Sequence, residues 1–240
     1  MSRPKLIVSV DHVAGLRATT GSQEPDPIHY ALQAELAGAM GIRAHLRIDR
    51  HGFSERDAEL INRLVKTRFY LQLSPHQDIV HLLNGLRPHN AILSAERRDE
   101  HALEHGLDAT LLTRELQSII KNVDSRQTRI FLFIEANLDQ VKAAARLDVH
   151  GVVINVRDIM LDLWGDAHTD KMRRLNDALR LAAKYKLEAH LASGILAEAI
   201  PELAALPGVT AIHMDYQLAA RSLIMGVTEA VRSYLDLLRI

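Results

Sequence analysis

Cysteine is absent from this chain of 240 residues. Disulfide bonds, catalysis by a thiolate and metal sites built on cysteine are therefore excluded. Long apolar runs are missing too: none reaches the length of a transmembrane helix, and the N-terminus lacks the apolar core of a signal peptide. The formal net charge is only −1, so no overall attraction draws the chain to nucleic acid or to an anionic membrane. We expect a soluble, cytoplasmic protein that binds neither nucleic acid nor membranes.

Segments that would separate domains are also absent. No stretch rich in proline, glycine and serine divides residues 1–240, and the composition does not shift along them. Hydrophobic residues make up 48% of the chain and charged residues 25%, which supplies a core and gives no sign of disorder. We therefore expect a single domain over residues 1–240.

Short apolar runs alternate with longer amphipathic segments. The apolar runs lack strict polar alternation, which is typical of strands buried on both faces; they are 6–11, 42–47, 69–73, 91–95, 129–135, 151–156, 187–192 and 209–214. The segments between them predict helices near 27–40, 54–67, 75–86, 109–124, 137–147, 169–186, 196–206 and 217–238.

Eight strand–helix units in 240 residues predict a single (β/α)₈ TIM barrel. An open, doubly wound sheet is the alternative, but no Gly-x-Gly-x-x-Gly motif follows the first predicted strand. Residues 157–168 form a longer connection, which contains the only tryptophan, Trp164. We expect an extra short helix or a lid there.

Charged residues end the first two predicted strands. Asp11-His12 closes the first, and the loop after it carries Arg17; the second carries His45 and Arg47 and is followed by Arg50. The carboxyl ends of the strands are where a parallel barrel keeps its chemistry. Arginine binds phosphate or carboxylate through two parallel hydrogen bonds and stays charged. The histidine is a candidate proton carrier because its pKa can be set near neutrality.

Polar side chains end all eight predicted strands. Solvation of strand ends is the plain explanation for such residues, but His, Asp and Arg on strands of Val and Ile favour a cleft. The polar residues assigned to this mouth are Ser9, Asp11, His45, Arg47, Gln72, Ser94, Glu96, Glu135, Asn155, Arg157, His190, Ser193, His213 and Asp215.

Several motifs resemble one enzyme family, pyridoxine 5′-phosphate synthase. The first is Val-Asp-His-Val-Ala-x-Leu-Arg, followed by Pro25-Asp26-Pro27 and then by His-Leu-Arg-x-Asp-Arg. The resemblance extends over nearly the whole chain; its carriers are 10–17, 25–27, 34–35, 37–39, 41–42, 45–47, 49–50, 56–57, 66–68, 96–98, 106–108, 132–134, 204–207, 220–221 and Gly226.

The resemblance implies a (β/α)₈ barrel with extra helices that assembles into a homo-octamer. It implies the ring-closing condensation of 1-deoxy-D-xylulose 5-phosphate with 3-amino-2-oxopropyl phosphate in vitamin B6 biosynthesis, with no metal or organic cofactor. By position, Asp11, His12 and Arg47 would contact the xylulose phosphate. His45 would act as a general acid or base, and Gly194 would offer its backbone to the second phosphate. The other predicted substrate contacts are Ser9, Arg17, Arg50, Glu96, His213 and Asp215.

Two catalytic positions depart from the family pattern. The family's glutamate on the third strand is Gln72, and its histidine before the phosphate-binding glycine is Ser193. Glutamine cannot accept a proton near neutral pH, and serine lacks the tunable imidazole. Asp215-Tyr216 replaces a Gly-His pair and adds a negative charge beside the second phosphate. Further departures are Ser9, Thr20, Ile48, His51-Gly52 and Ala102. We therefore expect the standard activity to be altered or lost.

Two further functions remain open on the same barrel. The chain could be a non-catalytic paralogue that serves as a binding or assembly partner. It could also be a metal-dependent enzyme, in which His213, Asp215 and His190 are joined by Asp11, His45 or Glu135. The plainer explanation of these candidate metal ligands is that they are hydrogen-bonded residues of the barrel.

Overall fold

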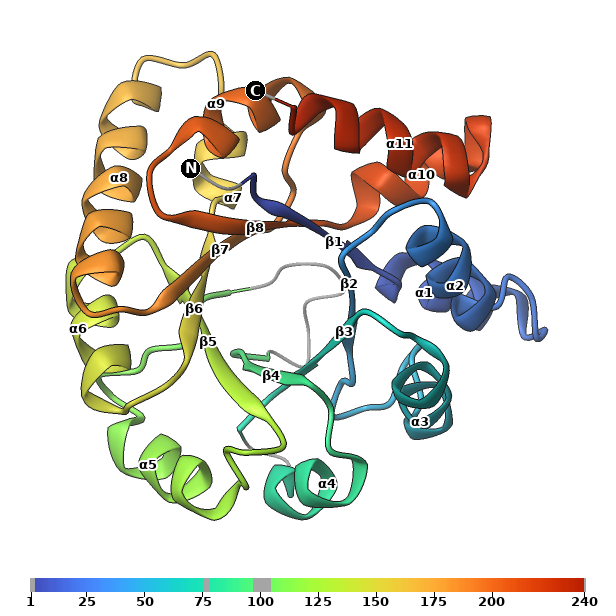
Figure 1. The fold of residues 1–240 in the computed structure, drawn as a ribbon, viewed down its shortest axis with the longest axis horizontal. Coiled ribbons are helices and arrows are strands. Elements are labelled where there is room, and N and C mark those ends of the chain that lie inside the picture. Colours follow the sequence, from blue (N-terminus) through green and yellow to red (C-terminus); the bar gives the residue numbers. More distant parts are fainter. Residues whose placement is uncertain (1–2, 76–77, 97–104, 240) are drawn as a thin grey trace.

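Eight parallel strands close into a barrel in the computed structural model, which describes residues 3–75, 78–96 and 105–239 (Figure 1). Each strand pairs with its neighbours in chain order, and β1 also pairs with β8. The strands are β1 (Lys5–Ser9), β2 (Gly41–His45), β3 (Arg68–Leu73), β4 (Asn90–Leu93), β5 (Arg129–Glu135), β6 (Gly151–Asn155), β7 (Glu188–Ala192) and β8 (Val209–Met214). The predicted (β/α)₈ TIM barrel is confirmed.

Helices surround the strands (Figure 1). They are α1 (Asp11–Thr20), α2 (Pro27–Leu36), α3 (Glu55–Leu64), α4 (Ile79–Leu86), α5 (Thr113–Asn122), α6 (Leu138–Arg146), α7 (Arg157–Met160), α8 (His168–Lys184), α9 (Ile200–Ala205), α10 (Tyr216–Met225) and α11 (Val227–Leu237), with a 3₁₀ turn at Ala197–Ala199. The extra short helix expected after the sixth strand is α7. None of the helices in the described part of the chain is long and apolar enough to cross a membrane.

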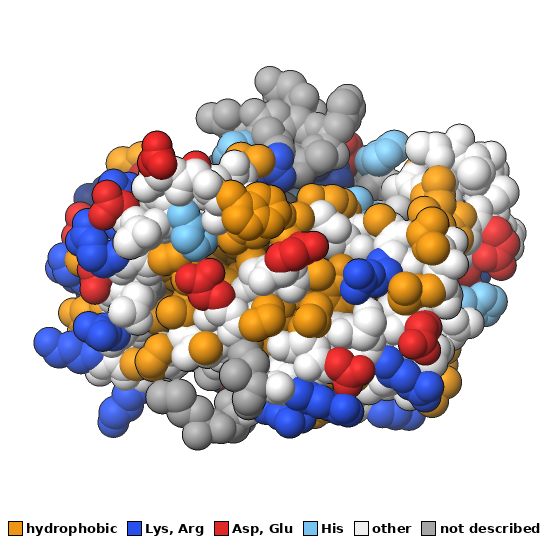
Figure 2. Space-filling view, turned by 90° about the horizontal axis from the view of Figure 1, so that it is seen from above, with side chains coloured by type: hydrophobic (Ala, Val, Ile, Leu, Met, Phe, Trp, Pro, Cys, Tyr) orange, Lys and Arg blue, Asp and Glu red, His pale blue; other side chains and the backbone are white. Residues whose placement is uncertain are grey.

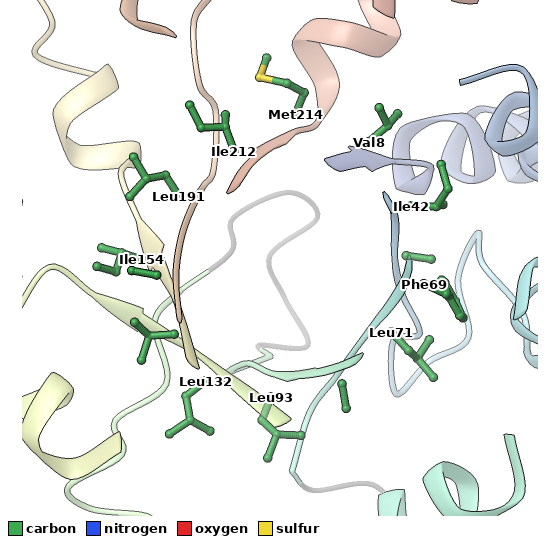
Figure 3. Close-up of a cluster of buried hydrophobic side chains, with 14 of the residues drawn as sticks. Val8, Ile42, Phe69, Leu71, Leu93, Leu132, Ile154, Leu191, Ile212 and Met214 are labelled. Carbon is green, nitrogen blue, oxygen red and sulfur yellow. The ribbon is translucent and has the colours of Figure 1, made fainter. Parts of the chain in front are cut away.

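Successive side chains along each strand point alternately outward and inward, which gives two separate hydrophobic cores. Outward-facing side chains such as Val8, Ile42 and Leu132 meet the surrounding helices, and Figure 3 shows this layer around the strands. Inward-facing side chains fill the barrel; those in its apolar cluster are Ile7, Tyr70, Ile92, Phe131, Phe133, Val153, Ala192 and Ala211. The same alternation carries polar residues to the inside wherever a strand reaches the barrel mouth.

Two predicted segments differ from the structure. The expected loop after the first strand is helix α1, in which Val13 and Ala14 are buried and which ends at Gly21 in the left-handed conformation, with φ of 62°. The expected helix 217–238 is two helices, because Gly226 interrupts it with φ of 82°. Gly21 ends α1 and Gly226 ends α10, because glycine adopts a positive φ at little cost.

Candidate active site at the barrel mouth

Asp11 connects the ends of β1 and β2. One of its carboxylate oxygens accepts the backbone N–H of His45 at 2.6 Å, and the other accepts the hydroxyl of Ser9 at 2.7 Å. The Arg43 guanidinium lies 3.9 Å from that second oxygen. A carboxylate held by three groups has a fixed orientation, so Asp11 can present a charge to a ligand without first being ordered.

Arg43 is a site residue that the sequence analysis missed. Its side chain is 1% exposed and points into the barrel between β1 and β3. The signal was available, because Arg43 lies two residues before His45 on the same strand, and residues two apart share a face. Arg43 lies deeper in the barrel than the strand ends, at which the sequence predicts the site.

A second cluster joins β2 to the segment after β4. Nε2 of His45 lies 3.6 Å from the Glu96 carboxylate, which also accepts the backbone N–H of Ile48 at 3.0 Å. Arg47 lies 3.7 Å from Glu96 and donates two hydrogen bonds to Asp49. Burial by itself raises the pKa of Glu96, but His45, the Ile48 N–H and Arg47 together lower it below its ordinary value. Glu96 is therefore a carboxylate that faces His45.

Buried amides and hydroxyls line the rest of the mouth. Gln72 donates to the hydroxyl of Ser94 at 3.0 Å, and both side chains are fully buried. On the far side of the barrel, Glu135 accepts from the Asn155 amide at 2.9 Å and from the backbone of Gly106 at 2.8 Å. These contacts put Gln72 and Glu135 in fixed positions at the ends of β3 and β5.

The sequence predicts His190 and His213 at the open mouth of the barrel, but the structure places both inside it. Their rings are joined by a 3.0 Å contact between Nδ1 and Nε2, and they pack against Tyr70 and Phe131. Burial lowers the pKa of His190 to about 3 and that of His213 well below its ordinary value, so both are neutral at physiological pH. His213 is 0% exposed, which does not favour the predicted direct contact with a substrate.

The metal alternative lacks its ligand set. His190 and His213 bind each other, and among the residues the structure describes no group of three or more His, Asp or Glu side chains could hold a metal ion.

The ends of β7 and β8 bring Ser193, Gly194 and Asp215 together. Asp215 accepts the backbone N–H of Gly194 at 2.9 Å, and both Ser193 and Asp215 are buried. Ser193 and Gly194 have φ of 82° and 65°, so this turn uses the left-handed region twice. The ring of Tyr216, the next residue, packs against His12 with 5.9 Å between ring centroids.

Two predicted anion-binding arginines are held by helix α3. Arg17 donates to both carboxylate oxygens of Asp57 and to the carbonyl of Gly52. Arg50 donates to Glu55 at 2.7 Å and to the carbonyl of Arg47 at 2.8 Å. Contact with a substrate would require either arginine to exchange these partners. Ala102, the departure on the segment after Glu96, lies outside the described residues.

Fold and site together define a parallel (β/α)₈ barrel with charged and acid/base side chains at the carboxyl ends of its strands. Residues 6–240 match the family described as "Pyridoxal phosphate biosynthesis protein PdxJ", and the chain belongs to this family.

Relatives called pyridoxine 5′-phosphate synthase align over almost their full length. The protein of Syntrophotalea carbinolica is 34% identical over 230 residues, covering 96% of each chain. That of Geobacter metallireducens is 31% identical over 241 residues, covering 98% of each chain. The predicted family is therefore confirmed.

Solved structures of low sequence identity share the fold. The KGPDC protein of Streptococcus mutans superposes with a TM-score of 0.67 at 10% identity, covering 99% of this chain and 98% of that one. Phosphoribosyl anthranilate isomerase of Thermotoga maritima gives a TM-score of 0.61 at 9% identity, covering 98% of each chain. At these identities the likeness concerns the barrel alone.

Proposed function

We propose that this chain binds a phosphorylated ketose-like substrate at the ends of β1 and β2, and that its ring-closing activity is weak or absent. The observation that carries the first part is the fixed carboxylate of Asp11, hydrogen-bonded to the His45 backbone and flanked by Arg43. A fixed carboxylate accepts sugar hydroxyls, and nearby cations attract the phosphate.

His45 is the proton carrier in this proposal. The Glu96 carboxylate, 3.6 Å from Nε2 of His45, can orient the imidazole. His12, exposed at the start of α1, and Arg47 supply the anion contacts. Because Arg47 is bound to Asp49, a phosphate must take the place of that carboxylate.

The second part of the proposal concerns Gln72 and Ser193. Gln72 is fully buried and hydrogen-bonded to Ser94, and its amide cannot take up a proton near neutral pH. Ser193 offers a hydroxyl in place of an imidazole. Loss of one general acid or base lowers a rate by about 10²–10⁴-fold, and this chain lacks two of those the resemblance implies.

Mass spectrometry of the purified protein supplied with both family substrates tests this proposal. We expect binding of 1-deoxy-D-xylulose 5-phosphate, measured separately by calorimetry, with little or no pyridoxine 5′-phosphate formed. An intact family member, assayed in parallel, serves as the active control. Turnover comparable to that of an intact relative would show that the changed positions are tolerated, and absence of ketose phosphate binding would refute the substrate assignment.

Assembly is the second candidate function, and one observation favours it. Leu223 and Ile224, at the end of α10, are 75% and 85% exposed. Figure 2 views the side of the molecule on which α10 and α11 lie and shows hydrophobic side chains gathered among charges of both signs. We propose association into a homo-octamer; light scattering coupled to gel filtration would give its mass, and a monomer would contradict the proposal. Co-purification with an intact family member would support the paralogue alternative.

A further inference from the structure

The backbone of the turn after β7 donates a hydrogen bond to a carboxylate of the protein itself. The amide N–H of Gly194 donates to Asp215 at 2.9 Å, and the Asp215 side chain is buried at the end of β8. Asp215 is the residue before α10, and its side chain does not cap that helix. The carboxylate instead reaches across to the neighbouring strand end.

The loops after the seventh and eighth strands have a common role in (β/α)₈ barrels. Their phosphate sites are commonly formed by the loops after the seventh and eighth strands and by a helix N-terminus, because backbone N–H groups and the helix dipole favour an anion. Here an anion of the protein itself takes the Gly194 N–H. A phosphate placed beside Asp215 would be repelled strongly, since like charges interact over short distances in a poorly solvated site.

The neighbours of Asp215 favour a cation. Tyr216 follows Asp215 in the chain, and its side chain is 41% exposed. The Tyr216 ring lies beside Gly194. The His12 ring packs against the same Tyr216 ring. A carboxylate and a partly exposed aromatic ring are groups that can bind an ammonium, through charge and through the ring quadrupole.

We propose that the β7–β8 end of the mouth receives a primary ammonium and rejects phosphate, so that the second substrate is an unphosphorylated amino ketone. This inference rests on the proposed function, which places the phosphorylated ketose at the β1–β2 end. The guanidinium groups of Arg43 and Arg47 lie at the β1–β2 end, where Asp11 and Glu96 face them, and Asp215 lies at the β7–β8 end.

Titration of the full-length protein with small probes tests the proposal without the ketose phosphate present. Aminoacetone and hydroxyacetone share the ketone and differ in ammonium against hydroxyl. We expect aminoacetone to bind at least about tenfold more tightly, as one charge-assisted contact allows. We also expect 3-amino-2-oxopropyl phosphate to bind more weakly than aminoacetone. Equal binding of aminoacetone and hydroxyacetone, or tighter binding of the phosphorylated amino ketone, would overturn the proposal.

Two variants assign the preference to one side chain. Asp215→Asn keeps an acceptor for the Gly194 N–H and removes the charge, so the preference for aminoacetone should disappear. Asp170→Asn removes an exposed carboxylate on α8, which pairs with Arg173, and should leave it unchanged. Persistence of the preference in Asp215→Asn would refute the role of Asp215. Binding of 1-deoxy-D-xylulose 5-phosphate is titrated separately, so its failure would affect only the proposed function.

Discussion

Asp11 organises the barrel mouth at the scale of single residues. Its carboxylate is shared by Ser9, the His45 backbone and Arg43, which belong to two adjacent strands. Arg47 and His45 extend this cluster to Glu96, so the cationic groups at the ends of β1 and β2 are already balanced by carboxylates. A bound phosphate must compete with those carboxylates, which makes the exchange at Arg47 the step to test.

Replacement of Arg47 by alanine should abolish measurable binding of 1-deoxy-D-xylulose 5-phosphate. A hydrogen bond to a charged group contributes about 1.5–3 kcal/mol, and loss of a guanidinium that makes two such bonds weakens binding by roughly a hundredfold or more. Isothermal titration calorimetry measures this directly. Arg126→Ala, on an exposed side chain paired only locally with Asp124, is the matched control. Unchanged affinity in Arg47→Ala would rule out its role in phosphate binding.

Restoring the two acid/base groups should raise ring-closing activity. The double variant Gln72→Glu/Ser193→His supplies a carboxylate at the end of β3 and an imidazole after β7. Each group adds at most about 10²–10⁴-fold in rate, so we expect the double variant to form pyridoxine 5′-phosphate faster than the unmodified chain. Product would be followed by mass spectrometry, with circular dichroism to verify folding. A folded double variant without any gain would show that other positions, such as Asp215, block the reaction.

At the scale of elements, an ion pair fastens α1 to α3. Asp57 is 1% exposed and binds Arg17 from α1, while its hydrogen bonds with Ser54 form the capping box that begins α3. Burial tends to raise the pKa of Asp57, but Arg17 and Ser54 outweigh it and lower this pKa. Asp57 therefore takes part in the capping box of α3 and also binds Arg17 on α1.

Asp57→Ala should destabilise the protein by about 3 kcal/mol. The change leaves Arg17 without its carboxylate and removes a helix cap, and breaking a buried pair typically has this effect. Urea unfolding followed by circular dichroism gives the free energy of unfolding. Glu59→Ala, on an exposed position of the same helix, should change it by no more than about 0.5 kcal/mol. A loss below about 1 kcal/mol in Asp57→Ala would mean that the pair contributes little.

At the scale of the whole molecule, the barrel encloses two neutral histidines. His190 and His213 are almost completely buried, and burial is the main reason that the pKa of each is lowered. Arg129, Lys5 and Arg68 lower the pKa of His190 further, Glu188 opposes them, and Arg43 and His190 act on His213. The folded barrel therefore takes up no proton at this pair until the pH is far below 6.5, the ordinary value for histidine.

This pair should make the fold sensitive to acid. Below about pH 6.5 the unfolded chain binds a proton at each histidine and the folded chain does not, so stability is present above that pH and is lost as pH falls towards about 3. The expected slope is on the order of 1.4 kcal/mol per pH unit for each histidine.

Unfolding free energies of the wild type at about pH 7 and about pH 5 measure that slope. The double variant His190→Leu/His213→Leu removes both partners of the contact and should flatten it. His81→Leu, on helix α4, provides a control histidine outside the barrel. The same slope in wild type and double variant would contradict the role of the pair.

Prediction from sequence succeeded where a residue's role is local. The eight strands were found within a few residues because fully buried strands are continuous apolar runs. Helix α1 was missed because its ten residues include Gly15 and two threonines and show little apolar periodicity. Arg43 was missed because it lies two residues before the strand end, although it shares the inward face with His45.

The sequence by itself determined the family, the barrel and which residue types stand at the strand ends, since these depend on patterns along the chain. Only the tertiary structure decided which of those residues meet: Asp215 with Gly194, Arg17 with Asp57, and His190 with His213. The physical reason is that each pair joins different elements, and the closure of the barrel sets the distance between them. Burial, which the same closure creates, keeps the His190 and His213 rings neutral by lowering the pKa of each.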